Sequence, residues 1–540
     1  MDQQKYSNRI VDIASRAGEM RKTLLVPVID GSSGEFIGDR GVQKDRLKEA
    51  ISGTVYESLG ESANTVVSSN SRSLQSYCKT NGEMPSDELL ASVHKSIENT
   101  LSLREAKNAL SGTVFEAAGD DMSSTEGILM RDRMVALILP VQLMAITNNM
   151  TTQIPADFNQ SEMFKIWRVA GSTFGDLTKG DKIDYNYNSR YTVMDQRWTA
   201  PAGDGTEVGG SASTTANYFQ FDSNTVFGKV YPIKRKSIKV LHNHDIVASD
   251  NGSGSIFGSF VNAEGNTVAV SGTVDYTTGT VNPVFSIAPA SPIAIHIGYD
   301  VDIEKDATLI PRIDHVMDSR VLYPHESAIS ANTTLQALWG LRREYNMNAD
   351  NMAMQAMRNL LAADRDRKIL QDLYFYSNGT TDWVYAPGDG VTTKEHYETL
   401  KETLLNIDTL LIGRTGISGL VGIVADPKAC AIFRYMPEPY FTPAAGYRKM
   451  AQPHYVGRVF GMWDLYEDPA KTAYTAMCYG KGPNHGDSSY VVGDAIPAIS
   501  FRHPTLTDLV YRSTLWDLGY RDINPFDGRD YLTTLTFSAS

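Results

Sequence analysis

The 540-residue sequence has few cysteines, no apolar run long enough to cross a membrane and no excess of basic residues. The three cysteines, Cys78, Cys430 and Cys478, lie far apart and lack the paired spacing of a zinc site, which favours a reducing compartment. The longest apolar run, Met134–Ile146, has 13 residues, whereas a bilayer requires about 20, so we expect it to belong to a hydrophobic core. Residues 1–22 carry charges and have no apolar stretch typical of a signal peptide.

Acidic residues exceed basic residues, which gives a formal net charge of −13 and a pI near 5.3. Because binding to a phosphate backbone depends on clustered lysine and arginine, this balance argues against direct gripping of DNA. Motifs for catalysis are equally weak. "GKG" at Gly480–Gly482 lacks the other residues of a phosphate loop, and "HNHD" at His242–Asp245 has no further spaced metal ligand. We therefore expect no enzyme activity, no catalytic residue, no metal site and no cofactor.

One 14-residue segment occurs twice: Lys48–Glu61 is KEAISGTVYESLGE and Lys107–Asp120 is KNALSGTVFEAAGD, with eight identical positions. One interpretation is a helix start, in which Thr54 and Thr113 cap the helix and the glutamate three residues later reaches back to the capping residue. The other is a pair of proteolytic processing sites, cut after the glutamate and before a small residue. The candidate processing residues are Glu57, Ser58, Glu116 and Ala117.

Residues 1–125 have a mostly helical and polar pattern. Ser86 is expected to cap a helix that ends at Gly112, because apolar residues recur along it at helical spacing. The residues of this apolar stripe are Leu90, Val93, Ile97 and Leu101. The Ser- and Asn-rich segment Asn64–Ser76 is predicted to be a linker.

Between Phe164 and Val247 the pattern changes to β. Alternating apolar residues predict one strand through Ile183 and another through Ile238 and Val240, facing each other in a long hairpin with a mobile tip. Such a hairpin cannot bury both faces within its own protomer, which predicts cover by a neighbouring chain. The candidate residues of this inter-subunit hairpin tip are Pro201, Gly205, Gly209, Gly210 and Asn217.

Short, turn-bounded strands fill residues 249–301, including a hairpin at Gly272–Val281, and predict a compact β barrel or sandwich-like module. A long helix follows, capped by Asp350 and closed at Gly379. The alternating charges of Asp364–Arg367, in the middle of this helix, are interpreted as a solvated or interface salt-bridge face.

The last third of the chain combines helices and strands. His396–Gly413 is predicted to be an amphipathic helix, and Leu420–Ala425 a buried strand. Asp426 is expected to cap the next helix, with Pro427 at its first position, and the tail of the chain returns to strands.

Several segments, taken in order, carry a resemblance to a known family. They are ALILPVQLMAITNNMTTQIP at Ala136–Pro155, GTVDYTTGTV at Gly272–Val281, the long helix from Asp350, GLVGIVADPKACAIF at Gly419–Phe433, GRVFGMWDLYEDP at Gly457–Pro469 and GYRDINPF at Gly519–Phe526. The sequence resembles the major capsid proteins of tailed bacteriophages, which have the Hong Kong 97 fold shared with herpesvirus capsid floors. The T-even-like branch, with its inserted β domain, is the most similar. The resemblance covers roughly residues 125–540.

The resemblance implies an α+β chain with a Hong Kong 97-type capsid fold. The parts of that fold are an N-terminal arm, an extended β-hairpin loop, a peripheral domain with a long spine helix and an axial α/β domain, to which this chain adds a small β insertion domain and a helical N-terminal extension. The implied boundaries are 1–116 for the helical extension, 117–163 for the arm, 164–248 and 302–330 for the extended loop, 249–301 for the insertion domain, 331–395 and 491–540 for the peripheral domain, and 396–490 for the axial domain. The extension is interpreted as a scaffold-like or cleaved segment.

The resemblance also implies a function. Proteins of this family assemble with themselves as hexamers and pentamers into the icosahedral head shell that encloses packaged double-stranded DNA, without sequence-specific binding. The implied location is the virion capsid, assembled in the host bacterial cytoplasm, and the implied partners are portal, scaffold and decoration proteins. A prohead protease is implied to cut after Glu116. The alternatives are another virion structural protein, of a vertex or tail, and a carbohydrate-binding or glycan-cleaving surface protein.

Overall fold

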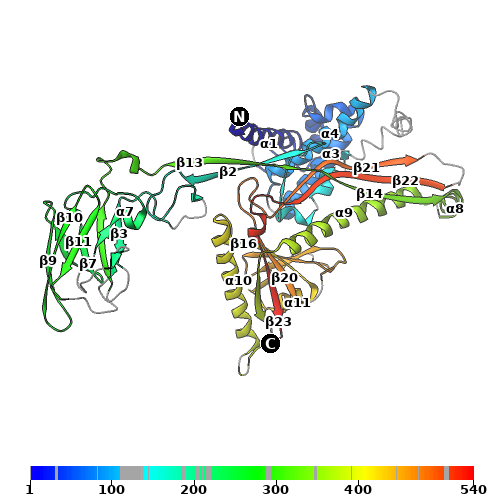
Figure 1. Cartoon of the computed structure of the whole chain (residues 1–540). Coiled ribbons are helices and arrows are strands. Elements are labelled where there is room, and N and C mark those ends of the chain that lie inside the picture. Colours follow the sequence, from blue (N-terminus) through cyan, green and yellow to red (C-terminus); the bar gives the residue numbers. More distant parts are fainter. Residues whose placement is uncertain are drawn as a thin grey trace. The chain divides into compact units, whose positions relative to one another are not determined.

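The computed structural model divides the chain into two compact units, which are shown in Figure 1: Met1–Ile166 with Met317–Ser540, and Trp167–Val316. It describes all residues except 1, 31–33, 82, 110–134, 137, 144, 184–188, 201–206, 209–210, 213–219, 288–293, 346–348, 389, 391, 439, 445–446, 472–473, 504–509 and 540. The fold is mixed α+β, as the sequence predicts.

The first unit begins with a helical domain. Its helices are α1 (Asp2–Leu24), α2 (Arg40–Glu49), α3 (Ala63–Asn81) and α4 (Asp87–Ala109). The predicted start of α4 is confirmed, because the Leu89 N–H donates to Ser86 Oγ at 3.3 Å. Leu90, Val93 and Ile97 of the predicted stripe are fully buried.

The prediction that Asn64–Ser76 is a linker is wrong, because this segment lies within α3. Its few apolar side chains, Val66, Val67 and Leu74, are all buried in the core of the helical domain. Serines are tolerated there because their hydroxyls find carbonyl acceptors: Ser68 Oγ donates to Asn64 O at 2.6 Å, four residues back in the helix.

The core of the helical domain also includes side chains from beyond α4. Val135, Ile138, Leu139 and Leu143 belong to the same buried cluster as apolar residues of α1, α3 and α4. The expectation that the apolar run Met134–Ile146 is core is thus confirmed for these four residues, whereas Val141 is 48% exposed.

A four-stranded sheet with the order β1-β21-β22-β14 forms the next part of unit 1. Its strands are β1 (Thr151–Gln153), β21 (Tyr490–His503), β22 (Val510–Ile523) and β14 (His325–Thr334), and the helices after β14 are α8 (Leu335–Tyr345) and α9 (Ala349–Tyr376). Helix α9 runs along β14, β22 and β21 (Figure 1). The predicted long helix is confirmed, although it begins at Ala349, so Asp350 lies in its first turn and not at the cap.

A seven-stranded sheet with the order β15-β23-β20-β16-β19-β18-β17 completes unit 1. Its strands are β15 (Thr380–Val384), β16 (Leu420–Ala425), β17 (Phe441–Pro443), β18 (His454–Val459), β19 (Trp463–Glu467), β20 (Thr475–Gly480) and β23 (Leu532–Ser538), and its helices are α10 (Thr393–Thr415) and α11 (Pro427–Tyr435). The predicted cap is confirmed: the Asp426 carboxylate accepts from the N–H groups of Lys428 and Ala429. Strand β23 lies between β15 and β20.

Unit 2 is built on one eight-stranded sheet with the order β3-β12-β7-β8-β9-β10-β11-β6. Its strands are β3 (Asp195–Thr199), β6 (Phe221–Asp222), β7 (Lys239–His242), β8 (Asp245–Asp250), β9 (Ser255–Val261), β10 (Thr267–Asp275), β11 (Thr280–Phe285) and β12 (Ile295–Asp300). Trp198 of β3 and Phe221 of β6 lie 5.5 Å apart between ring centroids. Because these are the two outermost strands, the sheet curls into a barrel-like arrangement. The predicted hairpin of β10 and β11 is confirmed, with Val274 opposite Val281.

The predicted hairpin between strands through Ile183 and Ile238 is wrong. Strand β7, which follows Ile238, pairs with β8 and β12, because Ile238 and Val240 are buried in the barrel core. The implied boundary at residue 249 likewise falls inside β8, which is hydrogen-bonded on both sides. The chain enters and leaves unit 2 through β2 (Ser161–Ala170) and β13 (Ile313–Leu322), which form a two-stranded sheet.

Candidate assembly and processing sites

Large apolar side chains are exposed on unit 1 from the end of β13 through α9. We define this set as the uncovered strip; its members are Val321, Tyr323, Trp339, Met352, Leu360 and Phe375. Trp339 of α8 is 71% exposed and Phe375 of α9 is 80% exposed, although both side chains are large and apolar. Apolar surface of this kind, concentrated on consecutive elements, is typical of a protein–protein interface.

Strand β14 lies at the edge of its sheet, between Tyr323 and Trp339 of the uncovered strip in the sequence. It has ten residues that alternate between exposed and half-buried, so one face is open and the other is only partly covered. Within the described part of the chain it pairs with β22 alone, and its other edge presents unpaired backbone groups. A long open edge can pair with another chain, so β14 adds backbone hydrogen-bonding capacity to the apolar side chains of the strip.

A buried charged junction connects α9 to the four-stranded sheet. Asp494 of β21 accepts from Arg365 Nη1 and Gln142 Nε2, each at 2.7 Å. Burial alone would raise the pKa of Asp494, but Arg365 and Arg521 outweigh it and hold that pKa below its usual range. Asp494 is therefore a buried, ionised acceptor.

This junction corrects in part the interpretation of Asp364–Arg367 as a solvated or interface salt-bridge face. Arg367 and Asp364 do form an exposed ion pair at 3.2 Å, whereas Arg365 points inward to Asp494. Asp366 is also turned inward and accepts from the Thr147 hydroxyl at 3.2 Å; burial raises its pKa. Sequence alone could not separate these four alternating charges, because the choice depends on what packs against α9.

Helix α4 supplies donors to an irregularity in β21. The pairing of β21 with β22 shifts register between Asp494 and Ile496, as at a β-bulge. Ser96 Oγ donates to Asp494 O at 2.6 Å, and Asn99 Nδ2 donates to Ala495 O at 2.9 Å. A signal for these residues was present in the sequence, since Ser92, Ser96 and Asn99 recur at helical spacing and form a second, polar buried stripe.

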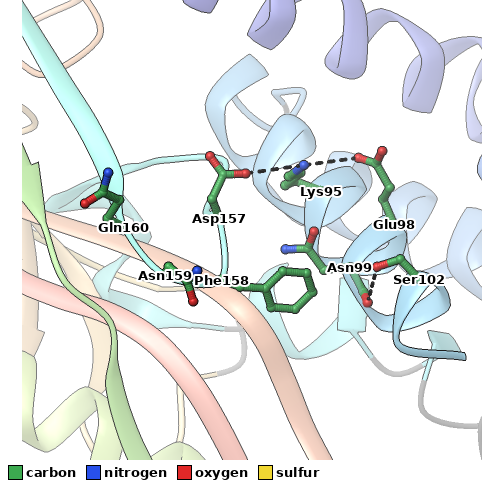
Figure 2. Close-up of a pocket in the computed structure, with 8 residues that line it drawn as sticks. All are labelled: Lys95, Glu98, Asn99, Ser102, Asp157, Phe158, Asn159 and Gln160. Carbon is green, nitrogen blue, oxygen red and sulfur yellow. Dashed lines mark hydrogen bonds and ion pairs between the residues drawn. The ribbon is translucent and has the colours of Figure 1, made fainter. Parts of the chain in front are cut away.

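A polar pocket of about 660 Å³ lies between α4 and the segment before β2 (Figure 2). Lys95 Nζ lies 3.6 Å from Glu98 Oε2 and 3.4 Å from Asp157 Oδ1, so one cation serves two carboxylates. The residues that line the pocket are Lys95, Glu98, Asn99, Ser102, Asp157, Phe158, Asn159 and Gln160. The contact between Lys95 and Asp157 ties α4 to the segment before β2.

The first candidate processing bond, Glu57–Ser58, lies in a short 3-10 helix, Val55–Ser62. The capping box predicted there is wrong: the Thr54 hydroxyl donates to Ile51 O at 2.6 Å, and the Glu57 carboxylate accepts from the Gly53 N–H. Glu57 and Ser58 are exposed, but Tyr56 and Leu59 on either side are buried. A protease would have to displace the buried side chains of Tyr56 and Leu59 before it could cleave the Glu57–Ser58 bond.

The other predicted site residues lie outside the described residues. These are Glu116 and Ala117 of the second copy of the repeat, and Pro201, Gly205, Gly209, Gly210 and Asn217 of the hairpin tip. In the described part of the tip, Glu207–Val208 pairs with Ser211–Ala212 as two short antiparallel strands. Processing at the second copy and a role of the tip between subunits stay predictions.

The cysteines are free thiols, of which Cys430 and Cys478 are buried. Burial raises the pKa of both, that of Cys478 to about 12, so neither is a ready nucleophile. Among the residues described, no group of three or more His, Cys, Asp or Glu side chains could hold a metal ion. No described helix has both the length and the apolar character needed to cross a bilayer.

Solved structures that align with part of this chain include phage capsids and an encapsulin. The capsid of Myoviridae phage XM1 aligns over 42% of this chain and 78% of its own, at 9% identity and a TM-score of 0.30. The encapsulin SrpI of Synechococcus elongatus aligns over 43% and 79%, at 10% identity and a TM-score of 0.30. The mature capsid of bacteriophage PhiM1 aligns over 42% and 76%, at 12% identity and a TM-score of 0.29. The class represented among these neighbours is therefore that of phage capsids and encapsulins.

The family is shown by sequence. Protein IncB of Escherichia coli is 31% identical over 175 residues, which are 32% of this chain and 84% of IncB. This chain belongs to the family of Protein IncB. A family described as a domain of unknown function, DUF8615, matches residues 1–145, a range that ends just after Leu143 of the helical core.

Proposed function

We propose that this chain is the major capsid protein of a tailed bacteriophage. In this proposal it has a Hong Kong 97-type fold of the T-even-like branch and assembles as hexamers and pentamers into an icosahedral shell around packaged DNA. Helix α9 is the spine of the peripheral domain, the seven-stranded sheet with α10 and α11 is the axial domain, β2 and β13 are the arms of the extended loop, and the barrel is the inserted domain. Portal, scaffold and decoration proteins are the proposed partners, and the host cytoplasm is the proposed place of assembly.

The uncovered strip is the observation that carries the proposal. A lone soluble protomer gains nothing from exposing Trp339 and Phe375, whereas a subunit of a shell buries such surface against its neighbours. The order of elements supports the same assignment, because the segments that carry the sequence resemblance fall on the β10–β11 hairpin, α9, β16 with α11, and β18 with β19.

The test is expression of the full chain, followed by sedimentation and electron microscopy of the product. Closed shells of uniform size are expected. Rings or tubes would favour the alternative of a vertex or tail protein, and a chain that remains a monomer at all accessible concentrations would contradict self-assembly.

We also propose that the shell matures by proteolysis after Glu116. The first copy of the repeat is a poorer substrate because its flanking side chains, Tyr56 and Leu59, are buried. The mass of the chain from DNA-filled particles, measured under denaturing conditions, tests this. A fragment matching residues 117–540 is expected, and the uncut mass of 59.4 kDa as the sole species would contradict it.

A further inference from the structure

The helical domain is joined to the rest of unit 1 by a shared hydrophobic core. Val135, Ile138, Leu139 and Leu143 are between 0% and 8% exposed and pack in one cluster with the buried residues of α1, α3 and α4. In the sequence these two groups of residues lie on opposite sides of the proposed processing bond. A break at that bond would therefore leave each fragment holding part of the same core.

Polar contacts reinforce the same junction. The Asn99 amide uses both of its N–H groups on the core, donating to Ala156 O and Ala495 O at 2.9 Å each, and Ser96 donates to Asp494 O. The bulge in β21 leaves Ala495 without a partner residue in the ladder with β22, so carbonyl groups at the bulge need other donors. Helix α4 is the element that provides them.

A hydrogen bond and the charged junction complete the contact. His485 Nδ1 lies 2.8 Å from Glu88 Oε1, with side chains only 11% and 18% exposed. Gln142, from the segment that shares the helical core, donates to the buried Asp494 carboxylate. Apolar packing, backbone acceptors and charged groups thus all connect the two parts.

We propose that the helical domain, residues 1–102, is a permanent part of the protomer and stays bound to residues 135–540 after any break in the chain between them. The surface formed by Ala156, Asp494, Ala495 and the buried side chains of Val135, Ile138, Leu139 and Leu143 is then a docking site whose occupant is the chain's own N-terminal domain. The family match to residues 1–145 supports this division, because it includes both halves of the shared core. The proposal holds whether or not the chain forms shells.

The direct test places a specific protease sequence after Glu116 of the full-length chain. The folded protein is cut, cleavage is confirmed on a denaturing gel, and the cut protomer fraction is separated by native size exclusion with mass detection. Both fragments are expected to elute together with the mass of the uncut protomer. An N-terminal fragment that elutes by itself would overturn the proposal.

A matched pair of variants locates the contact. Asn99→Leu removes both donors to the core and is expected to weaken the association of the cut fragments at least ~10-fold. Ser102→Ala, on the same helix, removes a hydroxyl that donates to Asn99 O within α4 and should leave the association unchanged. Equal association of the two variants would contradict the role given to Asn99.

Hydrogen exchange on the unmodified chain provides a readout that needs neither cleavage nor substitution. If the helical domain is permanent, the amides of Leu90–Thr100 in α4 exchange as slowly as those of β21. Exchange of α4 at least ~100-fold faster than β21 would show that the domain opens by itself and would overturn the proposal.

Discussion

The barrel of unit 2 and the four-stranded sheet of unit 1 differ in whether their outermost strands are covered. In the barrel, the outermost strands β3 and β6 approach each other through Trp198 and Phe221, and alternate residues of β10 and β11 fill one core. In the four-stranded sheet, β14 remains an open edge, and the helices that follow it expose Trp339 and Phe375. The first arrangement buries its apolar side chains within one chain, whereas the second leaves large apolar side chains exposed.

The energetic scale of this difference is large. Covering the exposed parts of Trp339 and Phe375 removes roughly 200–350 Å² of apolar surface from water, which contributes about 5–9 kcal/mol before the costs of association. In the barrel, comparable aromatic area is already buried during folding. The apolar surface of the barrel therefore contributes to the stability of the protomer, whereas the apolar surface of the uncovered strip is left available for association.

The largest expected effect comes from breaking the strip. Phe375→Glu should lower the yield of shells by more than ~100-fold, because it places a charge in a surface that must lose water on association. The free energy of unfolding of the protomer should change by less than about 0.5 kcal/mol, since the side chain is 80% exposed. Gradient sedimentation measures the first quantity and urea denaturation the second.

The matched control is Val11→Glu, at an exposed apolar position of α1 outside the strip. It should change neither shell yield nor protomer stability. Normal shells from the Phe375→Glu variant would show that assembly does not depend on Phe375 of the uncovered strip, and the contrast with the barrel would not hold.

The next largest effect is expected inside unit 1, at the charged junction. Arg365→Met takes the α9 cation away from the buried Asp494 carboxylate and should cost about 3–5 kcal/mol of unfolding free energy. Arg367→Met breaks only an exposed pair with Asp364 and should cost less than about 0.5 kcal/mol. Denaturant titrations of both proteins compare a buried and a solvated arginine two positions apart, and equal losses would refute the inward position of Arg365.

A backbone substitution tests whether the barrel is self-contained. Gly279 has a φ of +73°, and a Cβ there would lie 2.3 Å from Ser223 Oγ and Tyr231 O, so Gly279→Ala should destabilise unit 2 by about 2–4 kcal/mol. Gly265→Ala, at a φ of +82° with no atom within 4 Å, should cost only about 1 kcal/mol. Hydrogen exchange in each unit is the measurement. A matching loss of protection in the strands of unit 1 would show that the barrel does not fold independently.

Acid should weaken unit 1 through Asp494. Because the folded pKa of this carboxyl is held below its unfolded value of about 3.9, its contribution is fully present above that pH and is lost as the pH falls through the folded value. Urea titrations between pH 6 and pH 2 should therefore show a loss of about 1–3 kcal/mol that Arg365→Met no longer shows. An unchanged pH profile in the variant would assign the acid sensitivity to other groups.

The smallest effects compare two helix caps. Asp426→Ala should cost about 1–2 kcal/mol, because the carboxylate accepts from two N–H groups at the start of α11. Thr54→Ala should cost less than about 0.5 kcal/mol, because the Thr54 side chain makes no bond to the N–H groups of the helix that follows it. Thermal denaturation resolves the difference, and a larger loss at Thr54 would restore the capping box there.

Sequence reasoning succeeded where neighbouring residues determine the structure. The cap at Asp426 with Pro427, the stripe of α4 and the β10–β11 hairpin each depend on residues within one element or one turn. Helix α9 was found for the same reason, although its start was misplaced by two residues.

Sequence reasoning failed where contacts with residues distant in the sequence determine the structure. The serines of Asn64–Ser76 suggested a linker, but Val66, Val67 and Leu74 are buried in a core that other helices share. The alternation through Ile238 and Val240 predicts a strand but does not identify its partners. These partners are β8 and β12, and the segment through Ile183 is not one of them. At the candidate site, Arg365 and Asp494 are 129 positions apart, so no local pattern could have joined them.

The position of β23 has a consequence for the timing of synthesis. Asp382 of β15 contacts Thr536 of β23, 154 positions later, and β23 also separates β15 from β20. At roughly 5–20 residues per second, a ribosome needs about 10–30 s to travel this distance. During that interval the seven-stranded sheet lacks the strand that pairs with β15, so this sheet cannot be completed until Leu532–Ser538 has been synthesised.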